Sequence, residues 1–70
     1  MSIHILTSDE FPKIEKIKKK FDVFRVLYIT KGNLKIVEFF NKDGAFRGFG
    51  RDTKAAYKKA KKTLKQHYTS

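Results

Sequence analysis

Apolar residues follow a helical period in two stretches of the chain. The first stretch repeats them at spacings of three and four residues: Phe11, Ile14, Ile17 and Phe21. Such spacing is typical of a helix with one apolar face. It predicts a helix over residues 10–21 with Asp9 as its N-cap. Lysines fill the other sides. The run at residues 16–20 could add phosphate contacts or resemble a localisation signal, but we expect a solvated face.

The second helical stretch has two very unequal faces. After Asp52, the expected N-cap, one side carries small, aromatic and polar residues: Thr53, Ala56, Tyr57, Ala60, Thr63, Leu64, His67 and Tyr68. The other side is almost purely positive: Lys54, Lys58, Lys59, Lys61, Lys62 and Lys65. We therefore predict a long helix that lies on a sheet with its first side and presents the lysines outward.

The remaining stretches are rich in β-branched and aromatic residues and predict strands at residues 2–7, 24–30, 34–40 and 45–50. The segments 31–33 and 41–44 are short turns, with Gly44 suited to a positive φ. The order is β-α-β-β-β-α in a single small basic domain, residues 1–70. We predict an α+β fold, an antiparallel meander sheet with two helices packed on one face.

The last strand predicts how one helix approaches the sheet. Gly48 and Gly50 alternate with Phe49, so one face of this strand is bare and a helix can come close to it. Arg47, Phe49 and Arg51 share the opposite face. An aromatic and basic patch for base stacking is one interpretation of these three residues, and a core Phe between surface arginines is the other.

Charge points to the class of partner. The chain has 17 Lys and Arg against 7 Asp and Glu, a net charge of +10. Within residues 45–70, eight basic residues stand against Asp52 alone. A solvated helix usually mixes in Glu for ion pairs, and this one has none. The asymmetry favours a nucleic acid, bound through phosphates.

The sequence offers little for catalysis or membrane insertion. It contains no Cys, and His4 and His67 lie at opposite ends, so we expect no metal and no other cofactor. No nucleophile–base set or P-loop occurs, and we predict a non-enzymatic protein. The first residues lack the features of a signal peptide, and no apolar run is long enough to span a membrane. We expect a soluble, cytoplasmic protein.

Two families are similar to the chain. The run from Leu34 to Ala56, a strand, a turn, a strand ending in Gly-Phe-Gly and a basic helix, resembles the second half of a double-stranded-RNA-binding domain. Lys54 matches one of that family's helix-start lysines, and Ala56 and Ala60 match its small buried positions. Asp52, Thr53 and Tyr57 stand where that family has Ser, Lys and Lys, and its longer Pro- and His-containing loop is absent.

The whole chain resembles ribosome-hibernation promoting factors in outline. Residues 1–8 look like the opening strand of that family, and the segment 52–66 looks like its last helix, with an initial acid, paired alanines and a later leucine. The chain is shorter than that family, and its first helix is less full. Both resemblances imply contact with structured RNA, double-stranded or ribosomal, through the basic helix.

We therefore predict an RNA-binding module that docks by charge and shape. The expected nucleic-acid-binding residues are Arg47, Arg51, Lys54, Lys58, Lys61, Lys62 and Lys65. RNA is favoured over DNA, and the ribosome is one candidate partner.

Three alternatives stay open. A DNA-binding module, similar to the arm-binding domains of phage integrases and to plant AP2-type domains, would read the major groove through Arg25, Arg47 and Arg51. A small adaptor or inhibitor would bind an acidic protein surface. Finally, Phe39 and Phe40 point to opposite faces of their strand, so one needs cover from a helix, a ligand or a second copy. A homodimer through an exposed sheet face would supply it.

Overall fold

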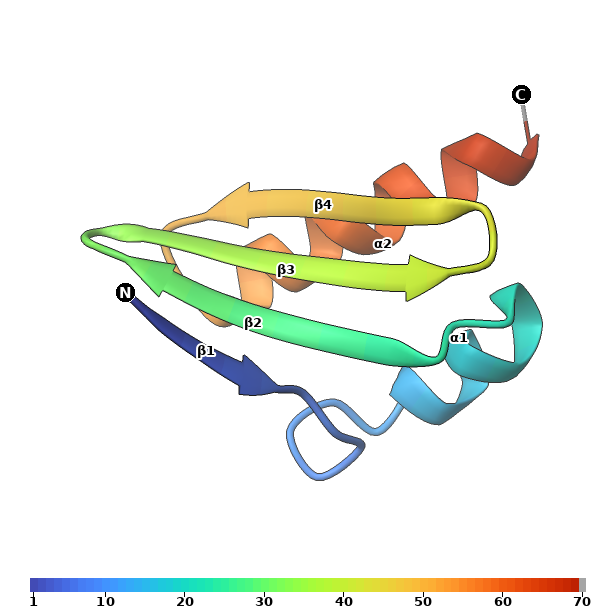
Figure 1. Cartoon of the computed structure of the whole chain (residues 1–70), viewed down its shortest axis with the longest axis horizontal. Coiled ribbons are helices and arrows are strands. Elements are labelled where there is room, and N and C mark those ends of the chain that lie inside the picture. The colour runs from blue at the N-terminus through green and yellow to red at the C-terminus, as the bar shows by residue number, and fades with distance from the viewer. Residues whose placement is uncertain (70) are drawn as a thin grey trace.

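A computed structural model describes residues 1–69 and confirms the predicted α+β fold (Figure 1). The elements follow the order β-α-β-β-β-α: β1 (Ser2–Ile5), α1 (Ile14–Phe21), β2 (Arg25–Lys31), β3 (Leu34–Asn41), β4 (Gly44–Gly50) and α2 (Thr53–Thr69).

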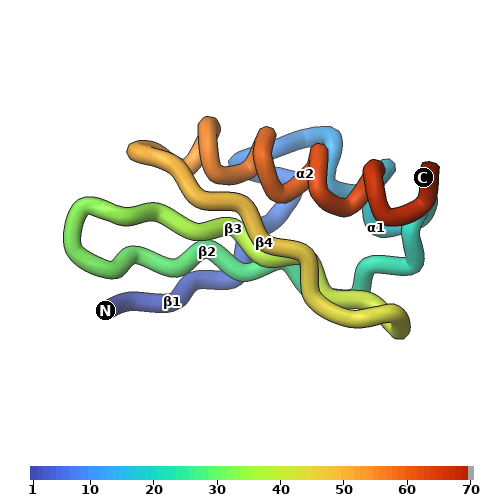
Figure 2. The backbone as a smooth tube through the Cα atoms, turned by 90° about the horizontal axis from the view of Figure 1, so that it is seen from above, coloured from blue at the N-terminus to red at the C-terminus, as the bar shows by residue number. Residues whose placement is uncertain are grey.

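The four strands form one antiparallel sheet in the order β1-β2-β3-β4. Both helices lie on the same side of this sheet, which leaves its other face open (Figure 2). The turns that close the meander are short, with Gly32 at φ 61° and Gly44 at φ 136°. These left-handed values suit glycine, and the prediction for Gly44 is confirmed.

Helix α2 lies directly against β4, as the bare face of that strand predicts. A methyl group added at Gly48 would come within 2.1 Å of the Ala60 amide nitrogen and 2.5 Å of the Ala56 carbonyl oxygen. Asp52 caps the helix as expected, because its carboxylate accepts a hydrogen bond of 2.8 Å from the Ala55 amide. The glycines and the small helix residues therefore fix how closely helix and sheet approach.

The core lies between the helices and the inner face of the sheet. Its fully buried members come from β2, β3, α1 and α2: Ile14, Val26, Val37, Phe39, Ala56, Ala60 and Leu64. Phe39 faces the helices, whereas its neighbour Phe40 is half-buried on the open face. The predicted split of this pair is thus confirmed.

The start of α1 differs from the prediction. The helix begins at Ile14, not at residue 10, and Asp9 is not its N-cap. Glu10 instead closes a local turn, in which its carboxylate accepts hydrogen bonds from the Thr7 amide at 2.9 Å and the Thr7 hydroxyl at 2.8 Å. Pro12 disfavours a helical conformation at the preceding residue, so the helix starts after the proline. The same turn ends β1 at Ile5, two residues earlier than predicted.

Two aromatic pairs connect α1, or the segment just before it, to α2. The rings of Phe11 and Tyr57 stack with centroids 4.2 Å apart, and those of Phe21 and Tyr68 stack at 5.4 Å. The first pair joins the starts of the two helical regions and the second joins their ends, so the helices run side by side in the same direction. Asn41 supports the second pair, because its amide donates to the Phe21 carbonyl at 2.9 Å and the Tyr68 hydroxyl at 2.7 Å.

Candidate nucleic-acid interface

The lysines of α2 are accessible, but they do not form one flat face. Lys61 and Lys65 lie on the flank that faces α1, and Lys59 and Lys62 lie on the flank that faces β4. Residues three to four apart share a side of a helix, so each of these pairs projects from one flank. The four lysines therefore line two separate hollows.

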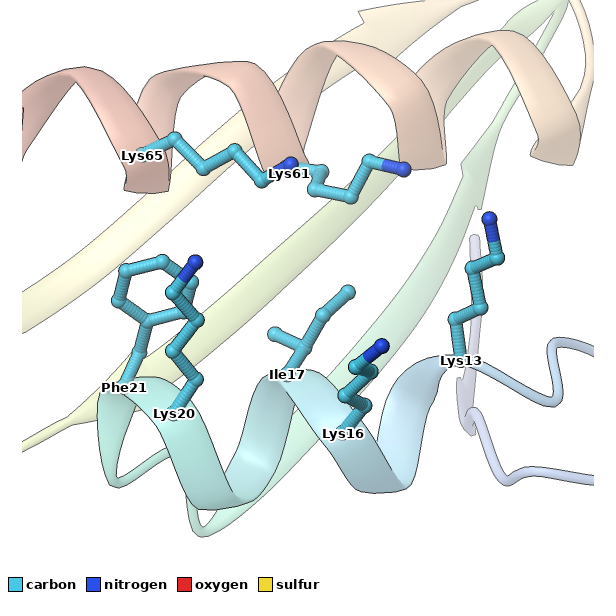
Figure 3. A pocket seen from close by; sticks show the side chains of 7 residues that line it. All are labelled: Lys13, Lys16, Ile17, Lys20, Phe21, Lys61 and Lys65. Atoms are coloured by element: carbon cyan, nitrogen blue, oxygen red, sulfur yellow. The ribbon is translucent and has the colours of Figure 1, made fainter.

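The first hollow lies between α1 and α2 and encloses about 230 Å³. Five lysines line it, three from the α1 segment and two from α2: Lys13, Lys16, Lys20, Lys61 and Lys65. Ile17 and Phe21 lie between the two rows, and Lys13 and Lys20 extend toward α2 (Figure 3). None of its lining residues among positions 1–69 is acidic. We call this site the two-helix lysine groove.

The electrostatics of the groove favour an anion. Partial burial lowers the pKa of Lys61, and the charges of Lys65, Lys13 and Lys58 lower it further. The part of this shift that comes from the neighbouring charges shows that the ammonium groups repel one another. A bound phosphate would relieve this repulsion, because an opposite charge nearby favours the protonated form.

Aromatic rings beside the groove help to position two of its ammonium groups. The ammonium of Lys61 lies 5.5 Å from the ring centroid of Tyr57, and that of Lys20 lies 5.5 Å from the ring of Phe21. Both distances allow cation–π attraction. The aromatic pairs that join the helices therefore also hold lysines at the groove.

The second hollow lies between α2 and β4. Its basic members are Arg47, Lys59 and Lys62, beside Gly48 and the half-exposed Phe49. Arg47 and Phe49 are exposed on the open side of β4, as strand alternation predicts, whereas Arg51 follows the strand's end. Their role in base stacking stays a prediction.

Arg47 also has a structural contact. Its Nε donates to the Glu38 carboxylate at 3.0 Å, and Glu38 is only 5% exposed on the open face of the sheet. A buried carboxylate needs such a partner, because leaving the charge unpaired is costly. Arg47 therefore neutralises the charge of Glu38, and only part of its guanidinium is free for a ligand.

The structure places the predicted residues in three groups. Lys61 and Lys65 line the groove, Lys62 and Arg47 line the second hollow, and three others are exposed outside the linings of both: Arg51, Lys54 and Lys58. The prediction missed Lys13, Lys16 and Lys20 of the groove and Lys59 of the second hollow. Residues 13, 16 and 20 flank the apolar stripe of α1 at spacings of three and four, which is the signal that reveals them.

Within residues 1–69, no three His, Asp or Glu side chains are grouped so that they could hold a metal ion. Neither described helix has the length and apolar character needed to cross a bilayer.

Comparisons with protein-family models, with curated proteins and with solved structures give no significant match for this chain. The candidate interface accordingly rests on the geometry and charge described above.

Proposed function

We propose that the chain is a non-enzymatic nucleic-acid-binding module that holds the phosphate backbone of structured RNA in the two-helix lysine groove. The observation that carries this proposal is the gathering of five lysines from two helices around one hollow lined by no acid. The lysines would neutralise phosphates and release counterions, which gives affinity with little sequence preference.

Further cations extend the proposed path. Lys54 and Lys58 precede the groove lysines on α2 and are exposed, so a backbone leaving the groove would meet them. Lys62 and Arg51 would contact a second segment of a bulky RNA on the β4 side, where Arg47 is engaged with Glu38. The resemblance to double-stranded-RNA-binding domains and ribosome-hibernation factors supports RNA, and the ribosome is a candidate target in a cytoplasmic setting.

The residues on the open face of the sheet do not favour the DNA alternative over RNA binding. A sheet that reads the major groove presents hydrogen-bonding side chains to base edges. Here a row of apolar residues crosses the open face, and Arg47 is engaged with Glu38. We therefore favour RNA bound in the two-helix lysine groove over DNA bound on the sheet.

The test measures duplex RNA binding by fluorescence anisotropy between about 50 and 300 mM salt, with nuclease-treated protein. The variant Lys13→Gln/Lys16→Gln/Lys20→Gln removes one row of the groove. We expect at least a tenfold loss of affinity and a salt slope reduced by about 3, since each phosphate-bound lysine contributes about 1.

The matched control is Lys18→Gln/Lys19→Gln/Lys31→Gln, which removes the same charge outside the groove. Equal losses in both variants would show attraction by overall charge and contradict the proposal. Loss of binding only in Arg25, Arg47 and Arg51 variants, and only on duplex DNA, would favour the DNA alternative. A partner captured from nuclease-treated lysate, with no RNA binding at low salt, would favour an acidic protein.

A further inference from the structure

The open face of the sheet carries an apolar surface that neither described helix covers. Strand pairing aligns one residue from each strand across it: Ile3 with Ile29, Ile29 with Ile36, and Ile36 with Phe49. Ile3 is 55% exposed and Phe49 45% exposed. We call Ile3, Ile29, Ile36 and Phe49 the apolar row.

Other apolar side chains extend the surface on either side of the row. Ile5, Leu27, Leu34 and Phe40 share its face by the alternation of the strands. Ile5 is 66% exposed and Leu34 40% exposed. A contiguous apolar patch of this kind on a small protein marks an interaction surface.

The charge of this face selects the partner. Near its centre, the Glu38 carboxylate and the Arg47 guanidinium neutralise each other. The cations of this face that could attract an acidic protein, Arg25 and Lys31, lie only at its margin. The face also offers nucleic acid few aromatic rings for base stacking and few unpaired cations for phosphate contact. An apolar surface with a neutral centre fits another surface of the same kind.

We infer that the open face of the sheet is a homodimer interface, with a second copy of this chain packed on it sheet to sheet. Two identical twisted sheets pack well when their strands cross at about −30°, and a twofold interface uses the same patch on both copies. This inference does not rest on RNA binding.

The net charge of +10 does not oppose this arrangement strongly. Both helices lie on the other side of each sheet (Figure 2). Because the lysine groove lies between these helices, it faces outward in the dimer. Sheets pack about 10 Å apart and each helix layer lies roughly 8–10 Å beyond its sheet. The two helix layers are thus roughly 25–30 Å apart, which exceeds two Debye lengths of about 10 Å at 0.1 M salt.

The area of the face predicts a weak dimer. Strands β2 to β4 are seven or eight residues long and β1 is four residues long. At about 4.8 Å between strands and about 3.3 Å per residue, the face covers roughly 400 Å² per copy. Stable interfaces bury about 800 Å² per partner, and transient ones less. We therefore expect association that depends on protein concentration.

The experiment is sedimentation equilibrium of RNA-free protein from about 10 µM to 1 mM. We expect the average mass to rise from 8.2 kDa toward twice that value. Ile3→Lys/Phe49→Lys places charge at both ends of the apolar row and should abolish the rise. The control Ser8→Lys/Thr69→Lys adds the same charge outside the strands and should leave the rise in place.

Two further measurements guard against misfolding of the variant. Ile3→Thr/Phe49→Thr introduces threonine, a β-branched residue that favours strands, and should weaken dimerisation at least tenfold, with an unchanged circular dichroism spectrum. In the wild type, concentration-dependent NMR shifts should appear at Ile29 and Ile36. A monomer at 1 mM, or shifts confined to the helices, would overturn the inference. Neither result depends on whether the groove variants bind RNA.

Discussion

At the scale of single residues, the hydroxyl of Tyr57 stands out. The side chain is 5% exposed, and its hydroxyl has no hydrogen-bond partner within residues 1–69. Burial also raises the pKa of Tyr57. An unpaired buried hydroxyl costs free energy, whereas the ring stacks on Phe11 and packs against Phe39.

We predict that Tyr57→Phe stabilises the protein by about 1 kcal/mol, because it removes the unpaired hydroxyl and keeps the ring. The advantage should grow above pH 10. The folded-state pKa of Tyr57 is above its unfolded value of 10.0, so wild-type stability falls as pH rises through this range. Urea unfolding at pH 7 and pH 10.5 measures both effects, and a destabilised variant at pH 7 would contradict them.

At the scale of elements, the contact between β4 and α2 determines where the groove lysines of α2 lie. The helix backbone touches the space that a side chain at Gly48 would need, and Gly50 lies similarly close, with a would-be methyl group 2.7 Å from the Ala56 amide nitrogen. Backbone atoms cannot rotate away as the end of a side chain can.

We expect Gly48→Ala to lower the free energy of unfolding by about 3 kcal/mol or more, because the whole helix must shift. Gly32→Ala is the comparison: φ is 61° there, but nothing lies within 4 Å of the added methyl group. Its cost should be about 1 kcal/mol. Thermal and urea unfolding of both variants measure the difference, and equal costs would refute the close-approach argument.

The elements also show what a sequence can and cannot reveal. Asp52 as a cap and Gly48 beside a helix were predictable, because each depends on neighbours in the chain or on strand alternation. The start of α1 was mispredicted, since Thr7 and Glu10 form a turn that competes with the helix. The groove was missed because it depends on the side-by-side placement of α1 and α2, which local periodicity does not contain.

At the scale of the whole molecule, unbalanced positive charge acts on the folded state. One ion pair, Glu38–Arg47, occurs within the described residues, against a net charge of +10. Self-repulsion of this kind destabilises a compact protein and is screened by salt.

We predict that sodium chloride raises the Tm of the free protein between about 20 and 300 mM while it weakens RNA binding. The variant Lys18→Gln/Lys19→Gln/Lys31→Gln, with its formal charge lowered from +10 to +7, should show a smaller rise. Differential scanning calorimetry gives the comparison. A Tm that falls with salt would mean that attractive pairs dominate.

The two aromatic pairs between α1 and α2 have a consequence for selectivity. Phe11–Tyr57 and Phe21–Tyr68 fasten the groove near both ends, so its width is set by ring stacking and not by its occupant. We therefore expect the two rows of lysines to keep the same separation with and without a ligand. A flexible single strand can adjust the spacing of its phosphates to this separation, whereas the phosphates of a stiff duplex must already match it. Competition between flexible and rigid polyanions of equal charge would therefore show which phosphate spacing the groove prefers.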